Sequence, residues 1–170
     1  DDIFTALVDA HNRGIDVRVV VDAKSANGNG SDVQALLDAK IPVKLNNEFR
    51  IMHNKYIVVD NKSVQTGSFN YSSNAEKRNA ENVLLLENQP DIAELYTKNF
   101  ERLFAGSKNL SNKNNYLSNY NTSYIEFIDK PIIDSFSVQI NNGIVDVAFS
   151  KACNYIQDSP SAKSLVMQVI

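Results

Sequence analysis

The stretch "IMHNKYIVVDNKSVQTGSFN", residues 51–70, decides the predicted fold. Apolar and polar residues alternate over residues 51–59, which predicts a strand whose every second side chain points to the same face. Residues 60–62, Asp-Asn-Lys, have turn chemistry, so residues 63–67 should run back beside the first strand. The stretch therefore predicts a β-hairpin.

Four polar side chains of this hairpin can converge on one small volume. His53 and Lys55 share a face of the first predicted strand, and Ser68 and Asn70 follow the end of the second. An ammonium and a carboxamide donate hydrogen bonds to anionic oxygens, while an imidazole attacks or transfers a proton. Each residue alone is typical of an ordinary strand or turn, but the combination indicates a phosphate site.

The spacing of these residues resembles a known signature. His-x-Lys, four residues, Asp60, six residues and Gly67-Ser-x-Asn match without a gap the HKD motif of the phospholipase D superfamily. Residues 66–86 are similar to the single-motif bacterial endonucleases of that superfamily, in which a Glu-Asn pair opens the next strand. Residues 2–22 resemble its helix-then-strand unit. The resemblance covers about the first 105 residues.

This resemblance implies phosphodiester cleavage without metal or cofactor, through a covalent phosphohistidine. His53 would be the nucleophile. Glu81 corresponds to the family's glutamate that accepts a hydrogen bond from the far ring nitrogen of the histidine and fixes its tautomer. The other implied roles are phosphate contacts by Lys55, Asn70 and Ser68 and structural roles for Asp60 and Gly67.

The chain carries one HKD motif, whereas the implied chemistry uses two histidines. The other histidine, His11, falls near the end of the first predicted helix, where the family has no catalytic group, and we expect it to be a surface residue. The second catalytic histidine must therefore come from a homodimer that brings two His53 rings together, or from a tandem second HKD repeat.

The leading hypothesis for the substrate is nucleic acid, either DNA or RNA. The resemblance of residues 79–82, Asn-Ala-Glu-Asn, to the nucleases favours it, as does the lack of an amphipathic or membrane-spanning segment. Arg50, Lys77 and Arg78 are candidate substrate contacts, with solvated surface charge as the alternative. The other hypotheses are a phospholipid-processing phospholipase D or transphosphatidylase, and a nucleic-acid-binding module active only with a partner repeat.

Composition sets further bounds. A net charge of −3 argues against a broad DNA-coating surface but permits a local basic groove. The single cysteine, Cys153, rules out an internal disulfide, and two separated histidines make no plausible zinc cluster. No run approaches the roughly 18–20 apolar residues of a membrane span. Because the chain begins with Asp-Asp, we expect a truncated N-terminus, and the compartment, periplasmic or cytoplasmic, stays open.

Residues 1–46 read as helix, strand, helix, strand, which implies crossover connections. We therefore predict an α/β fold with a mainly parallel mixed sheet flanked by helices, similar to the phospholipase D family. Residues 82–87 are too apolar for a strand with a solvent-exposed face. The predicted organisation is a catalytic domain at 1–106, a linker or surface loop at 107–132, and C-terminal strands at 133–170.

The resemblance also implies that a strand, a helix and a second strand precede the first helix of this chain, so the sheet should lack these elements. Residues 144–149 and 164–170 resemble the missing strands. The tail would then be the start of a second repeat or a permuted piece of the same sheet. In either case we expect both segments to pair near residues 16–21, with Ile170 close to Asp1.

Overall fold

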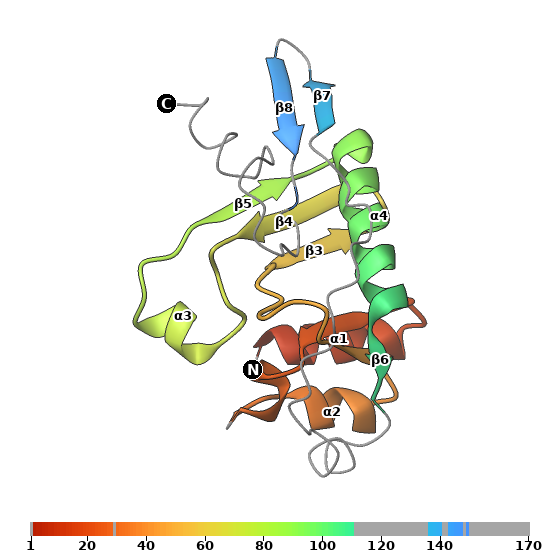
Figure 1. The fold of residues 1–170 in the computed structure, drawn as a ribbon, viewed down its shortest axis with the longest axis vertical. Coiled ribbons are helices and arrows are strands. Elements are labelled where there is room, and N and C mark those ends of the chain that lie inside the picture. The colour runs from red at the N-terminus through yellow and green to blue at the C-terminus, as the bar shows by residue number, and fades with distance from the viewer. Residues whose placement is uncertain (1, 29, 111–135, 141–142, 148, 150–170) are drawn as a thin grey trace.

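The computed structural model describes residues 2–28, 30–110, 136–140, 143–147 and 149 (Figure 1). The elements in chain order are α1 (Asp2–Asn12), β1 (Val19–Asp22), the 3-10 turn η1 (Ser25–Asn27), α2 (Val33–Asp38), β2 (Val43–Asn46), β3 (Tyr56–Val59), β4 (Ser63–Gly67), α3 (Ser73–Lys77), β5 (Val83–Leu86), α4 (Pro90–Gly106), β6 (Lys108–Asn109), β7 (Phe136–Ile140) and β8 (Gly143–Val147).

The strands form two three-stranded sheets and a separate hairpin. The first sheet has the order β1-β2-β6, the second has the order β3-β4-β5, and β7 pairs with β8. β1 and β2 are parallel, and the other described pairings are antiparallel. The predicted α/β fold with mixed strand pairing and flanking helices is confirmed. The prediction of a mainly parallel sheet is wrong for the described residues, because only β1 and β2 pair in parallel, whereas β3, β4 and β5 follow one another as antiparallel neighbours.

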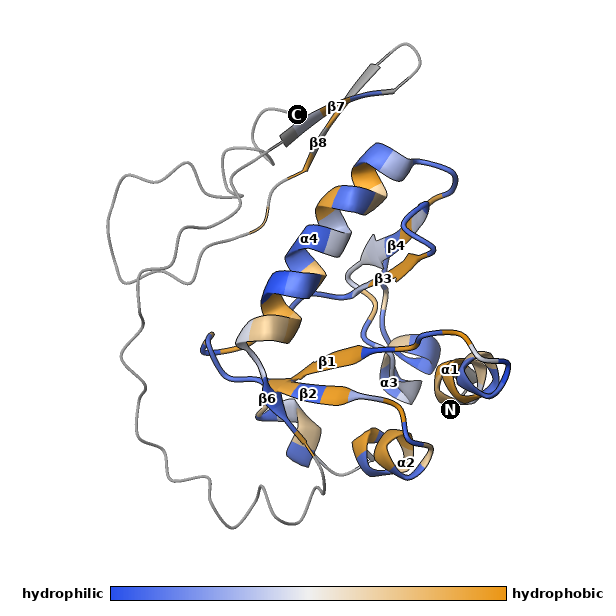
Figure 2. Cartoon of the chain, turned by 90° about the vertical axis from the view of Figure 1, so that its right-hand side faces the viewer, coloured by the Kyte–Doolittle hydropathy of each residue, from blue (hydrophilic) through white to orange (hydrophobic). Residues whose placement is uncertain are grey.

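Helices cover both faces of the first sheet. Apolar residues of α1, including Phe4, Leu7 and Val8, pack on the cluster that contains Val43 and Leu45 of β2. α2 joins this cluster, while α4 contacts the strands from the other side. Figure 2 shows the apolar strands β1 and β2 between these helices. The apolar residues of α1 therefore form one stripe that faces the sheet.

α4 crosses both sheets. Pro90 occupies its first turn, where the missing N–H costs no hydrogen bond. The helix contacts β1, β2, β3 and β4 and buries Ile92, Leu95 and Leu103. Figure 1 shows it running from the end of β5 down to β6. In the described part of the chain, no helix is both long and apolar enough to span a membrane.

β1 and β3 each present an open edge under this helix. Each is the end strand of its sheet, and within the described residues neither edge has a second strand partner. The side chains of Val19, Val20 and Val21 remain partly exposed, although helices cover both faces of this sheet. The arrangement fits the expectation of a sheet with elements missing.

β7 and β8 form a C-terminal hairpin that joins neither of the two sheets. β8 pairs with β7, and Val147 packs with Ile92 and Leu95 at the start of α4. The Phe149 ring meets Tyr96 edge-on at 5.1 Å between centroids. The predicted pairing of residues 144–149 beside β1 is wrong, because these residues find a partner strand next to them in sequence and an apolar helix face to cover. Residues 164–170 lie outside the described residues.

Two further expectations change. Residues 108–109 extend the first sheet as β6 and Leu110 is buried, so the predicted loop is wrong at residues 108–110, and residues 111–132 lie outside the described residues. The predicted burial of β5 is wrong, since Val83, Leu84 and Leu85 are 55%, 53% and 57% exposed. β5 is the end strand of its sheet, and its last residue, Leu86, packs against Ile92 and Leu95 of α4, whereas residues 83–85 stay exposed.

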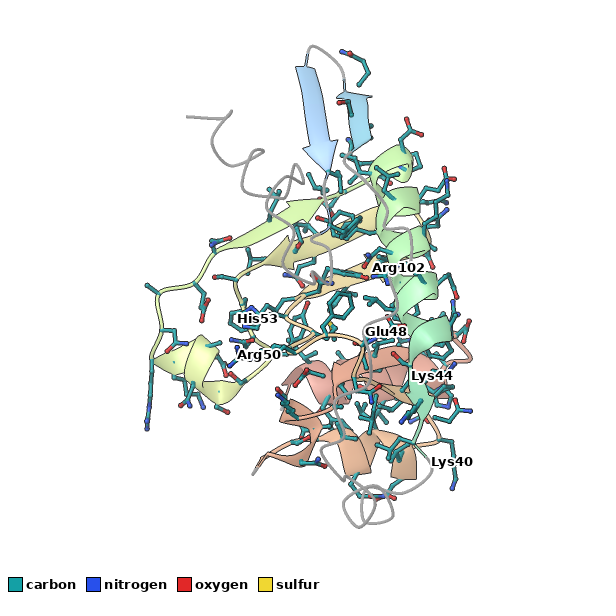
Figure 3. All side chains as sticks on the ribbon, in the orientation of Figure 1. Lys40, Lys44, Glu48, Arg50, His53 and Arg102 are labelled. Carbon is teal, nitrogen blue, oxygen red and sulfur yellow. The ribbon has the colours of Figure 1, made fainter. Side chains whose placement is uncertain are left out.

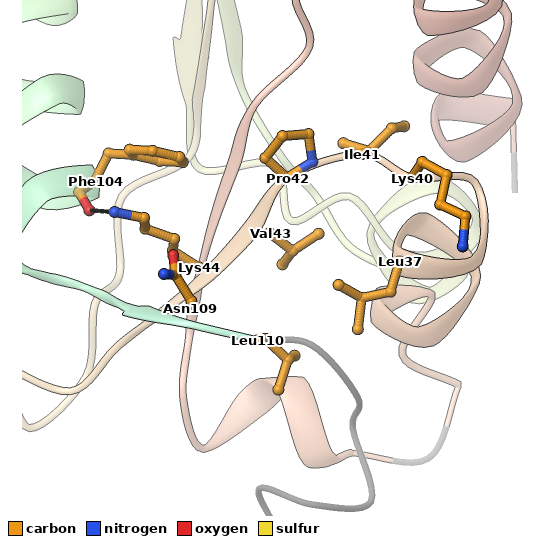
Figure 4. A pocket seen from close by; sticks show the side chains of 9 residues that line it. All are labelled: Leu37, Lys40, Ile41, Pro42, Val43, Lys44, Phe104, Asn109 and Leu110. Carbon is orange, nitrogen blue, oxygen red and sulfur yellow. Dashed lines mark hydrogen bonds between the residues drawn. The ribbon is translucent and has the colours of Figure 1, made fainter.

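A hollow lies between α2, β2 and the end of α4 (Figure 4). Lys44 reaches across it, with Nζ 2.8 Å from the Phe104 carbonyl oxygen and 4.1 Å from the centre of the Phe104 ring. Its lining is Leu37, Lys40, Ile41, Pro42, Val43, Lys44, Phe104, Asn109 and Leu110. None of the predicted site residues takes part, so this hollow is not the candidate active site.

Burial predicts how two leucines contribute to stability. Leu103→Ala should lower the free energy of unfolding by about 2–5 kcal/mol, because Leu103 is 2% exposed and truncation leaves a cavity. Leu84→Ala is the matched control and should cost under about 1 kcal/mol, since this side chain remains largely in water. Urea unfolding followed by circular dichroism measures both. An equal loss at Leu84 would show that β5 is covered in the full chain.

Candidate active site

The candidate site lies at the end of the second sheet where β3 begins and β4 ends. β3 starts at Tyr56, which pairs with Thr66, and His53 and Lys55 precede the strand. The predicted strand at residues 51–55 is wrong, because past Gly67 the chain leaves β4 and offers these residues no partner. Instead, Lys55 Nζ donates to the His53 carbonyl oxygen at 2.7 Å.

The other end of the hairpin holds Asp60. β3 and β4 pair from Tyr56↔Thr66 to Val59↔Ser63. In the turn that joins the two strands, φ is 53° at Asp60 and 52° at Asn61. Such positive values are tolerated best by Asp, Asn and Gly and are required by the tight turns of hairpins. Asp60 therefore shapes the turn at the end of the hairpin far from His53.

Gly67 allows β5 to approach the end of β4. Its φ is +151°, and a Cβ at this position would lie 2.2 Å from the Asn82 carbonyl oxygen. The same oxygen accepts a hydrogen bond from Ser68 N at 3.1 Å. A side chain at position 67 would therefore push apart the two segments that carry Ser68 and Asn82.

Ser68 is the centre of a hydrogen-bond cluster. Its hydroxyl donates to Glu81 Oε2 at 2.5 Å and accepts from Asn82 N at 3.0 Å. Asn79 Nδ2 donates to Glu81 Oε1 at 2.9 Å. The hydrogen bond from Ser68, followed by that from Asn79 and the charge of Lys55, lowers the pKa of Glu81. Glu81 is thus an anion at neutral pH, and the Ser68 hydroxyl hydrogen points to it.

Lys55 connects this cluster to His53. Partial burial lowers the pKa of Lys55 from its ordinary 10.5, and the nearby Glu81 carboxylate opposes that shift. The ammonium thus lies within the field of Glu81 while it holds the His53 backbone oxygen. The described contacts bring together His53, Lys55, Ser68 and Glu81. The first three are positions of the motif, and Glu81 is the glutamate that the resemblance implied beyond the motif.

The side chains of His53 and Asn70 are exposed to solvent. No described hydrogen bond reaches the His53 ring, so the expected bond from its far nitrogen to Glu81 stays a prediction. The Asn70 carbonyl oxygen accepts from Ser72 N at 2.7 Å, which places Asn70 in the turn before α3. The exposed imidazole and carboxamide are accessible to a substrate.

The predicted substrate cations are exposed as well. Arg50 lies in the segment between β2 and β3, Lys77 ends α3, and Arg78 caps that helix. In Figure 3, Arg50 and His53 lie on the side of the molecule toward α3, whereas Lys44, Glu48 and Arg102 lie beside α4. Among the described residues, no group of three or more His, Cys, Asp or Glu could hold a metal ion.

Sequence reasoning missed one acidic residue beside the site. Asp22, the last residue of β1, is 8% exposed and accepts a hydrogen bond from Met52 N, next to His53, at 3.0 Å. The signal was an aspartate at the carboxyl end of a valine-rich strand, where the ends of parallel strands commonly build sites.

Comparisons with known proteins agree on one family. Residues 1–104 match the family described as "Cardiolipin synthase, PLD-like domain". A phospholipase D from Rickettsia conorii is 44% identical over 98 residues, which are 58% of this chain and 48% of the relative. The mouse mitochondrial cardiolipin hydrolase is 37% identical over 94 residues, or 55% of this chain and 42% of the relative. The chain thus spans about half the length of these relatives or less.

Two solved structures share the fold. Nuc from Salmonella typhimurium, described as a phospholipase D family member, has a TM-score of 0.62 and 35% identity, covering 64% of this chain and 73% of that chain. NucT from Helicobacter pylori has a TM-score of 0.56 and 28% identity, covering 64% of this chain and 74% of that chain.

The close approach at Gly67 generates a prediction. Gly67→Ala should lower stability by at least about 1 kcal/mol and disrupt the Ser68 cluster, because the added methyl overlaps the Asn82 backbone. Gly28→Ala is the control, since φ there is −64° and the nearest atom is 3.2 Å from the added Cβ. Thermal unfolding and amide NMR shifts of residues 68 and 82 measure the effect. Unchanged shifts in Gly67→Ala would contradict it.

Proposed function

We propose that this chain, which belongs to the family described as "Cardiolipin synthase, PLD-like domain", is a phosphodiesterase that cleaves nucleic acid without a metal ion. The observation that carries the proposal is the cluster at the end of the β3–β4 hairpin. His53, whose imidazole is accessible, accepts a hydrogen bond from the Lys55 ammonium through its backbone oxygen. Lys55 lies in the field of the ionised Glu81 carboxylate, to which the Ser68 hydroxyl donates. These groups supply a nucleophile and positive charge from side chains alone.

In the first step, a ring nitrogen of His53 attacks phosphorus while the bond to the leaving oxygen breaks. Lys55 and Asn70 hold the two nonbridging oxygens and stabilise the negative charge of the transition state. Glu81 stabilises the positive charge that develops on the imidazole, and Ser68 positions Glu81 through their 2.5 Å hydrogen bond. The product is a phosphohistidine plus an alkoxide that needs a proton.

The second step requires a second histidine. An imidazolium from another HKD motif protonates the leaving oxygen, and the neutral imidazole then takes a proton from the water that attacks phosphorus. The P–N bond breaks, which releases a phosphomonoester and free His53. A second copy of this chain, paired about a twofold axis, or a tandem repeat would supply that histidine. His11 of the same chain lies in α1 and is not part of the cluster.

Nucleic acid is the favoured substrate because exposed cations flank the cluster. Arg50 precedes His53 by three residues, and Lys77 and Arg78 lie on the loop that joins Asn70 to Glu81. A polyanion places further phosphates on either side of the reacting one, where such cations contribute affinity without sequence readout.

A phospholipid phosphodiester is the second candidate, and one observation favours it. Val83, Leu84 and Leu85, which are 53–57% exposed, follow directly after Asn82 of the cluster. An exposed apolar strip beside a phosphate site is suited to contact with acyl chains or a membrane surface. The named relatives, a phospholipase D and a cardiolipin hydrolase, agree with this chemistry.

We predict that the full chain cleaves plasmid DNA or RNA in EDTA, and that His53→Ala reduces the rate at least about a thousandfold while unfolding at an unchanged temperature. The reason is that the nucleophile is lost, whereas the exposed side chain serves no core. Lys55→Ala and Asn70→Ala should each cost at least about a hundredfold. Gel assays with nucleic acid, and lipid analysis of phosphatidylcholine and cardiolipin vesicles, measure both substrates in parallel.

His11→Ala is the matched control and should keep full activity. Activity abolished by EDTA and restored by magnesium would overturn the metal-independent mechanism. Cleavage of vesicles but not of nucleic acid would select the second candidate. Binding of nucleic acid without cleavage would indicate a module that depends on a partner repeat. Full activity in a monomer would contradict the requirement for a second histidine from another HKD motif.

The lowered pKa of Lys55 predicts the alkaline limb of the pH profile. Lys55 binds anionic oxygens only when protonated, and burial favours its neutral form. We therefore expect kcat/KM to fall as pH rises, at a lower pH than an ordinary lysine would lose its charge. Lys55→Arg should shift that fall upward, because a guanidinium stays charged. Identical alkaline limbs in both proteins would assign the titration to another group.

A further inference from the structure

We propose that Asp22 is a positioning residue for His53, an inference that rests on the proposed function. Its carboxylate fixes the backbone of Met52, and thereby the imidazole that follows, against the end of β1. Asp22 touches neither the substrate nor the His53 ring in this role. It acts through the main chain.

The contacts of Asp22 are those of a dedicated anchor. Oδ1 accepts from Met52 N at 3.0 Å, and Oδ2 accepts from Ser25 N and Ser25 Oγ at 2.9 Å each. The carboxylate is 8% exposed, so water competes little for these bonds. Hydrogen bonds to a charged acceptor are the stronger class. η1 thus holds Asp22 on one side, and Asp22 holds Met52 on the other.

The segment that carries His53 needs such an anchor. Residues 47–55 form neither helix nor strand. At its start, Glu48 N donates to Asn46 Oδ1 at 3.3 Å, and at its end, the Lys55 carbonyl oxygen accepts from Thr66 Oγ1 at 3.2 Å. The bond from Met52 to Asp22 ties the middle of the segment to the other sheet. A displacement of about 1 Å at a reacting group can cost about a hundredfold in rate.

A carboxylate suits this position better than its isosteric amide. Both oxygens of Asp22 face N–H or O–H donors. Asparagine would turn its NH₂ group toward either Met52 N or the Ser25 donors, so that one side loses its acceptor and gains an opposed donor. Asp22→Asn therefore weakens the anchor on one side without creating a cavity, whereas Asp22→Ala removes both acceptor oxygens.

The test compares the full-length chain with Asp22→Asn and Asp22→Ala. Because the chain has two histidines, proton NMR resolves one ring of interest, His53, and one internal reference, His11. Hydrogen exchange reports on the Met52 amide directly. Steady-state kinetics with bis(4-nitrophenyl) phosphate separate kcat from KM. Asp16→Asn is the matched control, since Asp16 is also an aspartate flanking the β1 segment but its side chain is 78% exposed.

We expect the Met52 amide to be protected in the wild type and to exchange at least about tenfold faster in Asp22→Ala, with exchange in Asp22→Asn no faster than in Asp22→Ala. In Asp22→Ala the His53 resonance should shift while that of His11 stays fixed, and kcat should fall at least about tenfold with KM changed less than about threefold. Asp16→Asn should change none of these.

Rapid exchange of Met52 in the wild type would overturn the Asp22 role outright, as would unchanged Met52 exchange and His53 signals in Asp22→Ala. Equal shifts of both histidines would also overturn it, since they would report general loss of structure. These readouts need no turnover. An inactive wild type with a protected Met52 amide and a His53-specific shift would therefore overturn the proposed function and support the anchor.

Discussion

The packing of α4 across both sheets is the constraint on which the site depends. Within the described residues, β1 and β3 form no backbone hydrogen bonds with each other, so the contacts of α4 with both sheets fix their relative position. It binds the first sheet through the Arg18–Glu101 ion pair at 2.7 Å and the second through Tyr56 OH and Asn99 Oδ1 at 2.8 Å. Asn99 is 1% exposed, so its amide would be costly to leave unpaired.

This alignment matters because the site is built from both sheets. Ser68, Glu81 and Asn82 belong to the end of the second sheet, whereas the anchor of Met52 belongs to the end of the first. Between them lies the segment with His53 and Lys55. A shift of one sheet along α4 would therefore change the distance from the imidazole to the groups that support it, even with every hydrogen bond inside each sheet intact.

The sequence predicted what depends on local pattern. The hairpin turn at Asp60 follows from turn chemistry, and the helix, strand, helix, strand order of residues 1–46 follows from local pattern; both are in the structure. Three features depend on distant partners and escaped prediction. Residues 51–55 lack a strand to pair with, α4 packs on Leu86 but leaves residues 83–85 of β5 exposed, and Asp22 finds its partner thirty residues away. Alternation and apolar runs indicate which secondary structure and burial a segment favours. Tertiary contacts decide whether the segment adopts them.

The surroundings of the cluster differ on its two sides, and this difference bears on substrate choice. On one side the loop through α3 carries Lys77 and Arg78, and on the other Val83, Leu84 and Leu85 continue along β5. Asn82 stands between them with its amide on Ser68. A polyanion would gain binding affinity from the cations and leave the apolar strip in water. A lipid would gain affinity from the apolar strip and need one phosphate contact. In the proposed mechanism the chemistry at His53 is the same for both substrates, so we expect these flanks to discriminate between them.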